Sequence, residues 1–346
     1  MKKVFHFVNT NVLSGLENMV INISNIVDGY HHFYVSPDGP INDFLKTNGI
    51  DHISVDHISA LTVRRVIKQY QPDIVQGHDV TASVSLSLNF LYCARKHIAI
   101  ISEIHNNDPR MKRLGTRSFL FFLSAFAYDK IIVVSSAVRD EYIFKNFIKN
   151  KIIVIPNVID PSRIQLLKDL ETSSKDWDIA FLGRFVEQKD PLKFVKIIAN
   201  IKAKIPNINS IMIGDGMLKP LVQREISKLN LEKNITLVGF KSNPFPILKN
   251  IKILLITSRY EGFGLVALEA MSLGKPVVSP RVGGLISIVD ENSGFFASNI
   301  NDFSSYATKL IQDKKLYNEM SRSALARSIV INNIDNFKKS FKEIYK

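Results

Sequence analysis

The residues with the clearest chemical potential lie in the segment 257–278, where an apolar run is followed by a glycine-rich loop and an expected helix. Glu261 stands in the loop and Glu269 stands roughly one turn into the helix, so both carboxylates can face one site. Glycines let a backbone approach a ligand closely, and a helix start offers unpaired N–H groups. The connecting residues are Gly262, Phe263, Gly264 and Leu265. The pattern suits hydrogen bonds to sugar hydroxyls; a capping carboxylate and a solvated helix residue are the alternative.

A second group of candidates follows the apolar run that ends at Leu182. Gly183 turns the chain there, and Arg184 and Lys189 follow in the same loop. Arginine offers a bidentate fork and lysine a point charge, a combination that suits a diphosphate. Two fixed cations could neutralise a leaving nucleoside diphosphate without a metal ion. Ordinary surface charges in a loop are the alternative.

Other strand ends carry residues of lower specificity. Gly214 opens a Gly-Asp-Gly turn that is equally well explained as a structural turn. Ser14 and Gly15 lie in the loop after the first strand, where a helix cap is the alternative. His105 and His78 each follow an apolar run, which would let them reach a ligand, although a histidine at such a place is more often structural. No grouping of histidine, aspartate and cysteine resembles a metal site, so no metal is predicted.

The elements that must position these residues are strands alternating with helices. In the first part of the chain the expected strands are 3–8, 32–35, 73–76, 99–103 and 130–134, and helical patterns cover 61–70 and 81–96. The pattern then restarts, with strands at 152–155, 178–182, 210–213, 235–238, 253–256 and 276–278. This alternation predicts βαβ units and a parallel sheet in each half. In such sheets, ligands bind outside the carboxyl ends of the strands, which is where the candidate loops fall.

The composition is that of a folded protein with two domains. The chain has 346 residues, 46% of them hydrophobic and 22% charged, which fits two domains of about 150 residues each. The single cysteine, Cys93, excludes an internal disulfide and suits a reducing compartment. No stretch approaches the roughly 18–20 apolar residues of a spanning helix, and the apolar run at the start is too short for a secretory signal. We therefore expect a cytoplasmic protein.

The charge balance predicts an anionic partner, because lysine and arginine (45) exceed aspartate and glutamate (32) by 13. The sequence lacks helix-turn-helix, zinc-finger and ribonucleoprotein signatures, so nucleic acid is not expected. One segment combines basic residues with aromatic and aliphatic ones that share a helical face: Arg110, Lys112, Arg113 and Arg117, followed by Phe119, Phe122, Leu123 and Phe126. It suits a helix lying on an anionic membrane, and a core helix with a solvated basic loop is the alternative.

At these residues the chain resembles the group-one retaining glycosyltransferases with the GT-B fold, and the resemblance covers nearly the whole chain. The E-x7-E pattern of the family falls on Glu261 and Glu269, and its G-R-x4-K element falls on Gly183, Arg184 and Lys189. Four more stretches follow the order seen in the family: Ile213-Gly214-Asp215-Gly216, Val238-Gly239-Phe240, Gly274-Lys275-Pro276-Val277 and Val282-Gly283-Gly284. Ser14 and Ser287 depart from the pattern, at positions where the family usually has glycine and often glutamate, respectively.

The resemblance implies an α/β fold of two Rossmann-like domains that face each other across a cleft. Residues 1–160 would form the acceptor-side domain, residues 161–330 the nucleotide-sugar domain, and residues 331–346 a helix that crosses back to the first domain.

The resemblance also implies roles for the candidate residues. Arg184 and Lys189 would bind the diphosphate, and Glu269 would take the ribose hydroxyls. Glu261 would bind the donor sugar, and His105 a sugar hydroxyl near the reacting carbon. Transfer would retain the anomeric configuration by a front-face route, in keeping with the lack of a carboxylate pair placed as in a glycosidase.

The expected function is therefore a hexosyltransferase-like retaining glycosyltransferase. It would move a sugar from a nucleotide-diphosphate sugar to a glycan or lipid-linked acceptor in bacterial surface polysaccharide synthesis, without a cofactor. The protein would be cytoplasmic, with peripheral contact at the inner face of the cell membrane. Two alternatives stay open: a GT-B sugar-nucleotide epimerase, and a non-catalytic donor-binding subunit of a partner transferase.

Overall fold

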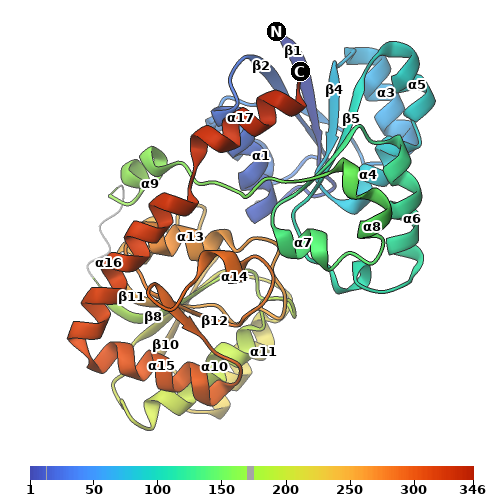
Figure 1. Cartoon of the computed structure of the whole chain (residues 1–346). Helices are drawn as coiled ribbons and strands as arrows, with labels where there is room; N and C mark the ends of the chain where they lie inside the picture. The colour runs from blue at the N-terminus through green and yellow to red at the C-terminus, as the bar shows by residue number, and fades with distance from the viewer. Residues whose placement is uncertain (13, 170–174) are drawn as a thin grey trace. The chain divides into compact units, whose positions relative to one another are not determined.

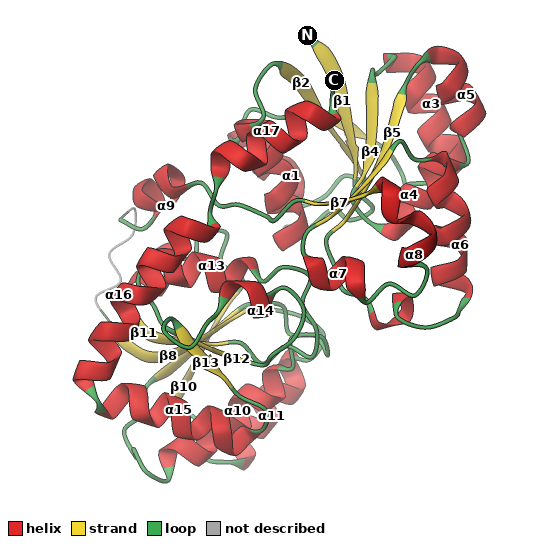
Figure 2. Cartoon of the chain, viewed as in Figure 1, coloured by secondary structure: helices red, strands yellow, loops and turns green. Residues whose placement is uncertain are grey.

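The computed structural model describes residues 1–12, 14–169 and 175–346, and the chain divides into two compact units (Figure 1). Unit 1 comprises Met1–Val158 together with Ile334–Lys346, and unit 2 comprises Ile159–Asn333. Each unit is built on one parallel sheet whose strands are joined mainly by helices (Figure 2). The predicted α/β class is confirmed.

The sheet of unit 1 has the strand order β3-β2-β1-β4-β5-β6-β7. Its strands are β1 Lys2–Phe7, β2 Tyr30–Ser36, β3 Asp51–Ser54, β4 Ile74–Gly77, β5 Ala99–Ile104, β6 Lys130–Val133 and β7 Ile152–Val154. Its helices are α1 Gly15–Ile26, α2 Ile41–Thr47, α3 Ala60–Tyr70, α4 Val80–Ser87, α5 Phe90–Lys96, α6 Thr116–Ser124, α7 Ser136–Asp140, α8 Lys145–Ile148 and α17 Ile334–Ile344. The strand order reverses between β1 and β4, which pair directly. Loops on either side of such a switch point commonly bind ligands.

Two local predictions for unit 1 were wrong, and one strand was not predicted. The strand at 152–155 was expected to open the second half, but β7 pairs with β6, where Ile152 lies opposite Ile131. β3 was missed because a four-residue strand of mixed polarity shows too little periodicity. The single helix expected over 81–96 is divided into α4 and α5 by a turn at Asn89, whose amide donates to the carbonyl oxygen of Ser85 and to that of Ala60.

Helix α17 belongs to unit 1, because an aromatic stripe buries one of its faces. Phe337, Phe341 and Tyr345 recur every four residues and are all buried. On the exposed side, Lys338 forms a 2.9 Å ion pair with Asp28. The three aromatic side chains provide most of the attachment, since exposed ion pairs stabilise little.

The sheet of unit 2 has the order β10-β9-β8-β11-β12-β13, a doubly wound arrangement. Its strands are β8 Trp177–Leu182, β9 Ser210–Ile213, β10 Ile235–Gly239, β11 Ile251–Leu255, β12 Val277–Ser279 and β13 Gly294–Phe296. Its helices are α9 Pro161–Leu167, α10 Pro191–Lys202, α11 Lys219–Lys228, α12 Phe245–Lys249, α13 Leu265–Ser272, α14 Leu285–Ile288, α15 Ile300–Gln312 and α16 Lys314–Ile331. The switch point lies between β8 and β11, which pair directly. The two strongest candidate loops of the sequence follow these two strands.

Candidate functional site

The loops after β8 and β11 are tied together at the switch point of unit 2. The hydroxyl of Thr257 donates to the carbonyl oxygens of Lys189 (2.8 Å) and Asp190 (3.0 Å). The backbone N–H of Arg259 donates to the carbonyl oxygen of Gln188 at 2.8 Å. Neighbouring parallel strands end at the same edge of a sheet, and these bonds hold their loops in register.

Lys189 and Glu261 are counter-ions within this pair of loops. The ammonium nitrogen of Lys189 lies 2.5 Å from Oε1 of Glu261, and the hydroxyl of Ser258 donates to the same oxygen at 2.6 Å. The lysine side chain is 19% exposed and the glutamate side chain 8%. The residue predicted to bind the diphosphate, Lys189, and the residue predicted to bind the sugar, Glu261, therefore contact each other directly.

Arg184 presents an exposed cation in the loop after β8. Across residues 1–12, 14–169 and 175–346, its guanidinium group has no hydrogen-bond or ion-pair partner. An arginine without a counter-ion, in the same loop as an ion-paired lysine, is well suited to bind an anion through two N–H groups. Gly183 and Lys189 lie against each other, since a Cβ at Gly183 would be 3.5 Å from Cγ of Lys189.

Glu269 is half-buried on α13, and burial raises the pKa of its carboxyl to about 7. The positive charges of Arg163 and Lys189 oppose this shift but do not overcome it. Arg163 belongs to α9 and was not singled out from the sequence. The cap at Asp160 and Pro161 marks the start of α9, yet nothing local indicates that its arginine faces a glutamate so distant in the sequence.

The predicted glycines allow the surrounding loops to approach closely. A Cβ at Gly283, where φ is +53°, would lie 1.8 Å from the carbonyl oxygen of Glu261. A Cβ at Gly214, where φ is +143°, would lie 2.0 Å from the carbonyl oxygen of Gly183. The backbone at each of these glycines therefore packs directly against one of the two candidate loops. The remaining predicted residues of this segment are the buried Gly262, Phe263 and Gly264 and the half-buried Leu265, which opens α13.

Ser14 and Gly15 lie in unit 1, where Gly15 begins α1 and Ser14 is its cap. The hydroxyl groups of Ser14 and Thr10 both donate to the carboxylate of Glu17, which is 1% exposed. The serine that departs from the family pattern thus holds a buried glutamate.

His105 lies just after β5 in unit 1, beside His78 and Glu103. Its Nε2 is 3.0 Å from Nδ1 of His78 and 3.5 Å from Oε1 of Glu103. Burial lowers the pKa of His105 to about 3 and raises the pKa of Glu103 to about 8. The ligand atoms of these three residues lie within 4.8 Å of one another, a spacing that a metal ion could bridge. The sequence did not indicate this cluster, because its members come from two separate strand ends.

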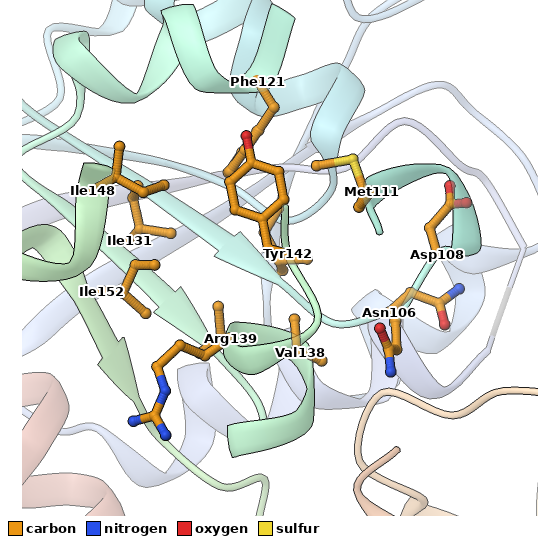
Figure 3. A pocket seen from close by; sticks show the side chains of 13 residues that line it. Asn106, Asp108, Met111, Phe121, Ile131, Val138, Arg139, Tyr142, Ile148 and Ile152 are labelled. Atoms are coloured by element: carbon orange, nitrogen blue, oxygen red, sulfur yellow. The ribbon is translucent and has the colours of Figure 1, made fainter. Parts of the chain in front are cut away.

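A pocket in unit 1 lies next to the segment that carries His105 (Figure 3). Asn106 and Asp108 line one side, whereas Ile131, Ile148 and Ile152 gather on the other. None of the residues predicted from the sequence lines this pocket.

The predicted site residues fall into two groups. Those in unit 2 are Gly183, Arg184, Lys189, Gly214 and the 261–269 segment, and those in unit 1 are Ser14, Gly15 and His105.

Comparison with known proteins places these features in a family context. Residues 162–327 match the family described as Glycosyl transferases group 1, and residues 28–163 match Glycosyltransferase Family 4. An uncharacterized glycosyltransferase of Methanocaldococcus jannaschii is 30% identical over 234 residues, which are 63% of this chain and 57% of that protein. A second from the same organism is 32% identical, over 62% of this chain and 59% of that protein. The chain thus spans under two thirds of these relatives.

One further relative and one solved structure match over nearly their full length. The UDP-Gal:alpha-D-GlcNAc-diphosphoundecaprenol alpha-1,3-galactosyltransferase of Escherichia coli is 28% identical, over 99% of this chain and 96% of that protein. The crystal structure of Anabaena Alr3699/HepE in complex with UDP-glucose is similar with a TM-score of 0.84 at 17% identity, over 99% of both chains. This structural likeness establishes the fold.

Proposed function

The chain belongs to the group 1 glycosyltransferases with the GT-B fold, and we propose that it is a retaining glycosyltransferase that uses a nucleotide-diphosphate sugar as donor. The observation that carries the proposal is the cluster at the β8–β11 switch point. There, Arg184 and Lys189 lie in the loop tied to the one that carries Glu261. Two cations beside a carboxylate match the diphosphate and the sugar of such a donor.

Each group in the cluster has a role in this proposal. Arg184 and Lys189 bind the diphosphate and stabilise the negative charge that develops on it as the sugar leaves. Glu261 binds hydroxyl groups of the donor sugar, and Glu269 accepts hydrogen bonds from the ribose. His105 accepts a hydrogen bond from a sugar hydroxyl. The UDP-glucose bound to the similar Anabaena protein supports this class of donor.

We propose a lipid-linked glycan as the acceptor. The similar Escherichia coli enzyme is named for an acceptor carried on diphosphoundecaprenol, and it aligns along nearly the whole chain. No helix in the described part of this chain is long and apolar enough to cross a membrane. A lipid-linked acceptor therefore calls for a surface that can contact the bilayer.

Such a surface is present on unit 1 around α6. Phe119, Leu123, Phe126 and Phe147 are 49%, 50%, 64% and 74% exposed. Phe122 joins them to a wider aromatic cluster, since its ring lies 5.5 Å from that of Phe126 and 5.8 Å from that of Phe147. Exposed aromatic groups gathered in this way mark an interaction surface.

Positive charge borders the aromatic surface. Arg113 is exposed, and Arg110 and Arg117 both form ion pairs with Asp108. Lysine and arginine next to exposed aromatic groups favour an anionic bilayer. We therefore propose that this surface lies on the anionic face of a membrane and gives access to a lipid-linked acceptor.

The donor assignment is tested by release of nucleoside diphosphate from UDP-glucose, UDP-galactose, UDP-N-acetylglucosamine and GDP-mannose, with and without a lipid-linked acceptor. We expect acceptor-dependent release from one donor and a product whose anomeric configuration, measured by NMR, matches the donor. An inverted product would remove the retaining assignment. Conversion of one nucleotide sugar into its epimer without release would establish the epimerase, and donor binding without either reaction would establish the binding subunit.

The membrane proposal is tested by flotation with vesicles of phosphatidylglycerol and phosphatidylcholine. We expect the wild-type chain to float, and a Leu123→Ser/Phe126→Ser variant to remain in the soluble fraction. Leu61→Ser is the matched control, because Leu61 is 81% exposed on α3. Charge is tested separately by changing Arg110, Arg113 and Arg117 to glutamate. Unchanged flotation of both sets of variants would contradict the proposal.

A further inference from the structure

Four histidines form a continuous hydrogen-bonded chain inside unit 1. Nε2 of His6 lies 2.8 Å from Nδ1 of His32, and Nδ1 of His6 lies 2.8 Å from Nε2 of His78. Nδ1 of His78 lies 3.0 Å from Nε2 of His105. The chain crosses four strands that are consecutive in the sheet, from β2 through β1 and β4 to β5. The function proposed above uses only its last member.

The backbone carbonyl of Val27 gives this chain a single direction. It lies 3.1 Å from Nε2 of His32, and a carbonyl can only accept, so His32 carries its proton on Nε2. Nδ1 of a neutral His32 must then accept from Nε2–H of His6. The same reasoning passes along the chain, and it places the proton of each ring on Nε2. His105 is left with an unprotonated Nδ1.

Burial keeps the four rings neutral, as this reasoning requires. His6, His32 and His78 are 0%, 7% and 0% exposed, and the side chain of His105 is 6% exposed. Burial lowers the pKa of every one of them. An imidazolium with two N–H donors, which would break the direction, is therefore disfavoured.

A second directional chain ends beside the first. The hydroxyl of Tyr345 donates to Oε1 of Gln76 at 2.6 Å, and Nε2 of Gln76 donates to Oε2 of Glu103 at 2.5 Å. Oε2 of Glu103 lies 3.3 Å from Nδ1 of His78. Because the proton of a neutral His78 is on Nε2, its Nδ1 has no proton to donate, whether or not Glu103 is ionised. The 3.0 Å contact with His105 therefore still requires a proton on Nε2 of His105.

The histidine chain ends at His105 in an acceptor without a partner. Nδ1 of His105 is buried and makes no hydrogen bond with any described residue. Leaving a buried polar atom unpaired is costly, so such an atom commonly serves a ligand. Only a ligand group that donates, such as a hydroxyl, can satisfy it.

We propose that His32, His6 and His78 are positioning residues that hold His105 as the Nε2–H tautomer, so that its Nδ1 accepts a hydrogen bond from a sugar hydroxyl. The identity of the ligand group rests on the proposed function, whereas the tautomer does not. The arrangement is selective by chemistry. A deoxy or fluoro group, or a carboxylate, cannot donate to Nδ1 and leaves it unpaired.

The direct test determines the tautomer of each histidine in the ligand-free protein. The tautomers are read from ¹⁵N NMR of the protein labelled at histidine, with assignment by single substitutions. We expect a proton on Nε2 and a pyridine-type Nδ1 for His6, His32, His78 and His105. A proton on Nδ1 of any of the four would overturn the proposal. So would zinc bound in one-to-one ratio at His78, Glu103 and His105, because it would occupy the lone pair of Nδ1 of His78.

A functional test separates the hydrogen-bonding role of His32 from the packing of its ring. His32→Phe keeps a ring but removes the donor to Val27 and the acceptor for His6, whereas His32→Gln retains one of each. The readout is kcat/KM for the best donor in the panel relative to its monodeoxy analogues. We expect wild type and His32→Gln to discriminate against one analogue and His32→Phe to lose about fivefold of that discrimination, the worth of one hydrogen bond. The exposed His57→Gln is the control.

The two proposals fail in distinguishable ways. If no donor is turned over but the four tautomers are as expected, the proposed function is wrong and the histidine chain stands. If donors are turned over and His32→Phe discriminates like wild type, the positioning role is wrong and the proposed function stands.

Discussion

Nζ of Lys189 lies 2.5 Å from Oε1 of Glu261, and this contact joins the loop after β8 to the loop after β11. A diphosphate that binds Lys189 must compete with this carboxylate. Once the phosphate oxygens take over the ammonium group, Glu261 becomes available to the hydroxyl groups of the sugar. Under the proposed function, the pair would therefore couple recognition of the two halves of a nucleotide sugar.

The first prediction concerns Glu261→Gln. A neutral amide competes less well for Lys189, so free UDP should bind about two- to fivefold more tightly, in keeping with the worth of a partly exposed ion pair. Turnover of the donor should nevertheless fall at least about tenfold, because a charge-assisted bond to the sugar is lost. Calorimetry with UDP and a release assay measure the two effects. Glu187→Gln, an exposed change in the loop after β8, is the control, and weaker UDP binding by Glu261→Gln would contradict the coupling.

The second prediction concerns the cations. Lys189→Ala and Arg184→Ala should each lower the rate of nucleoside diphosphate release by about 100-fold or more, since each removes a charge aimed at the leaving group. Arg184→Lys should recover only part of the loss, because an ammonium group cannot bind two oxygens side by side. Lys196→Ala removes an exposed lysine from α10 and should be silent. Full activity of Lys189→Ala would refute the diphosphate assignment.

The third prediction concerns the pH dependence of donor binding. Burial raises the pKa of Glu269 to about 7, and the ionised carboxylate is the better acceptor for ribose hydroxyls. Donor affinity should therefore decrease as the pH falls below about 7. Removing the nearby positive charge in Arg163→Ala should move the midpoint of this decrease to higher pH, and Glu269→Gln should abolish it. Titrations of donor binding between pH 5.5 and 8.5 measure the midpoint; a profile of Glu269→Gln that matches wild type would exclude Glu269 as its source.

The fourth prediction concerns stability at acidic pH. Burial lowers the pKa of His6, His32, His78 and His105 in the folded chain, so the unfolded chain binds protons at a higher pH. Their contribution is present above pH about 6.5 and is lost as the pH falls, by up to about 1.4 kcal/mol per pH unit for each histidine.

Urea unfolding at pH 7 and pH 5.5 measures this contribution. Glu103 and Glu269 act in the opposite sense, since burial raises the pKa of each carboxyl and favours folding at lower pH. We expect the net free energy of unfolding to fall on acidification, and to fall less in His32→Phe than in wild type. An equal fall in both proteins would show that His32 takes up no proton on unfolding.

The fifth prediction concerns Gly283. A methyl group at this position would meet the carbonyl oxygen of Glu261, so Gly283→Ala should lower both the melting temperature and donor affinity by displacing the 261–264 loop. Gly49→Ala is the matched control, because φ is +66° there and a Cβ meets nothing within 4 Å. The control should show only the backbone cost of about 1–2 kcal/mol. Equal effects of the two changes on donor affinity would contradict a close approach at Gly283.

Much of the cluster at the β8–β11 switch point could be predicted because its signals are local in the sequence. Apolar strands that end in glycine-bearing loops marked Arg184, Lys189 and Glu261, and the sheet order then placed these loops together. Arg163 could not be found in this way, because its proximity to Glu269 depends on how α9 packs.

The histidine chain was missed for a related reason. His6 and His32 lie inside strands, where a single polar residue usually indicates a solvent-facing position. Whether such a residue is buried depends on which strands become neighbours, and that is a long-range property. For His6, the flanking Phe5 and Phe7 were the one available signal, since buried parallel strands read as continuous apolar runs.

The division of unit 1 between residues 1–158 and 334–346 has a consequence for biosynthesis on the ribosome. Unit 2 is continuous in the sequence and can complete its sheet soon after it leaves the exit tunnel. Unit 1 emerges earlier but lacks Phe337, Phe341 and Tyr345 until residues 334–346 have followed unit 2 out of the tunnel, and these are three of its buried aromatic side chains. Unit 1, whose first residues emerge first, is therefore completed after unit 2, and the hydrogen bond from Tyr345 to Gln76 forms only after unit 2 has been made.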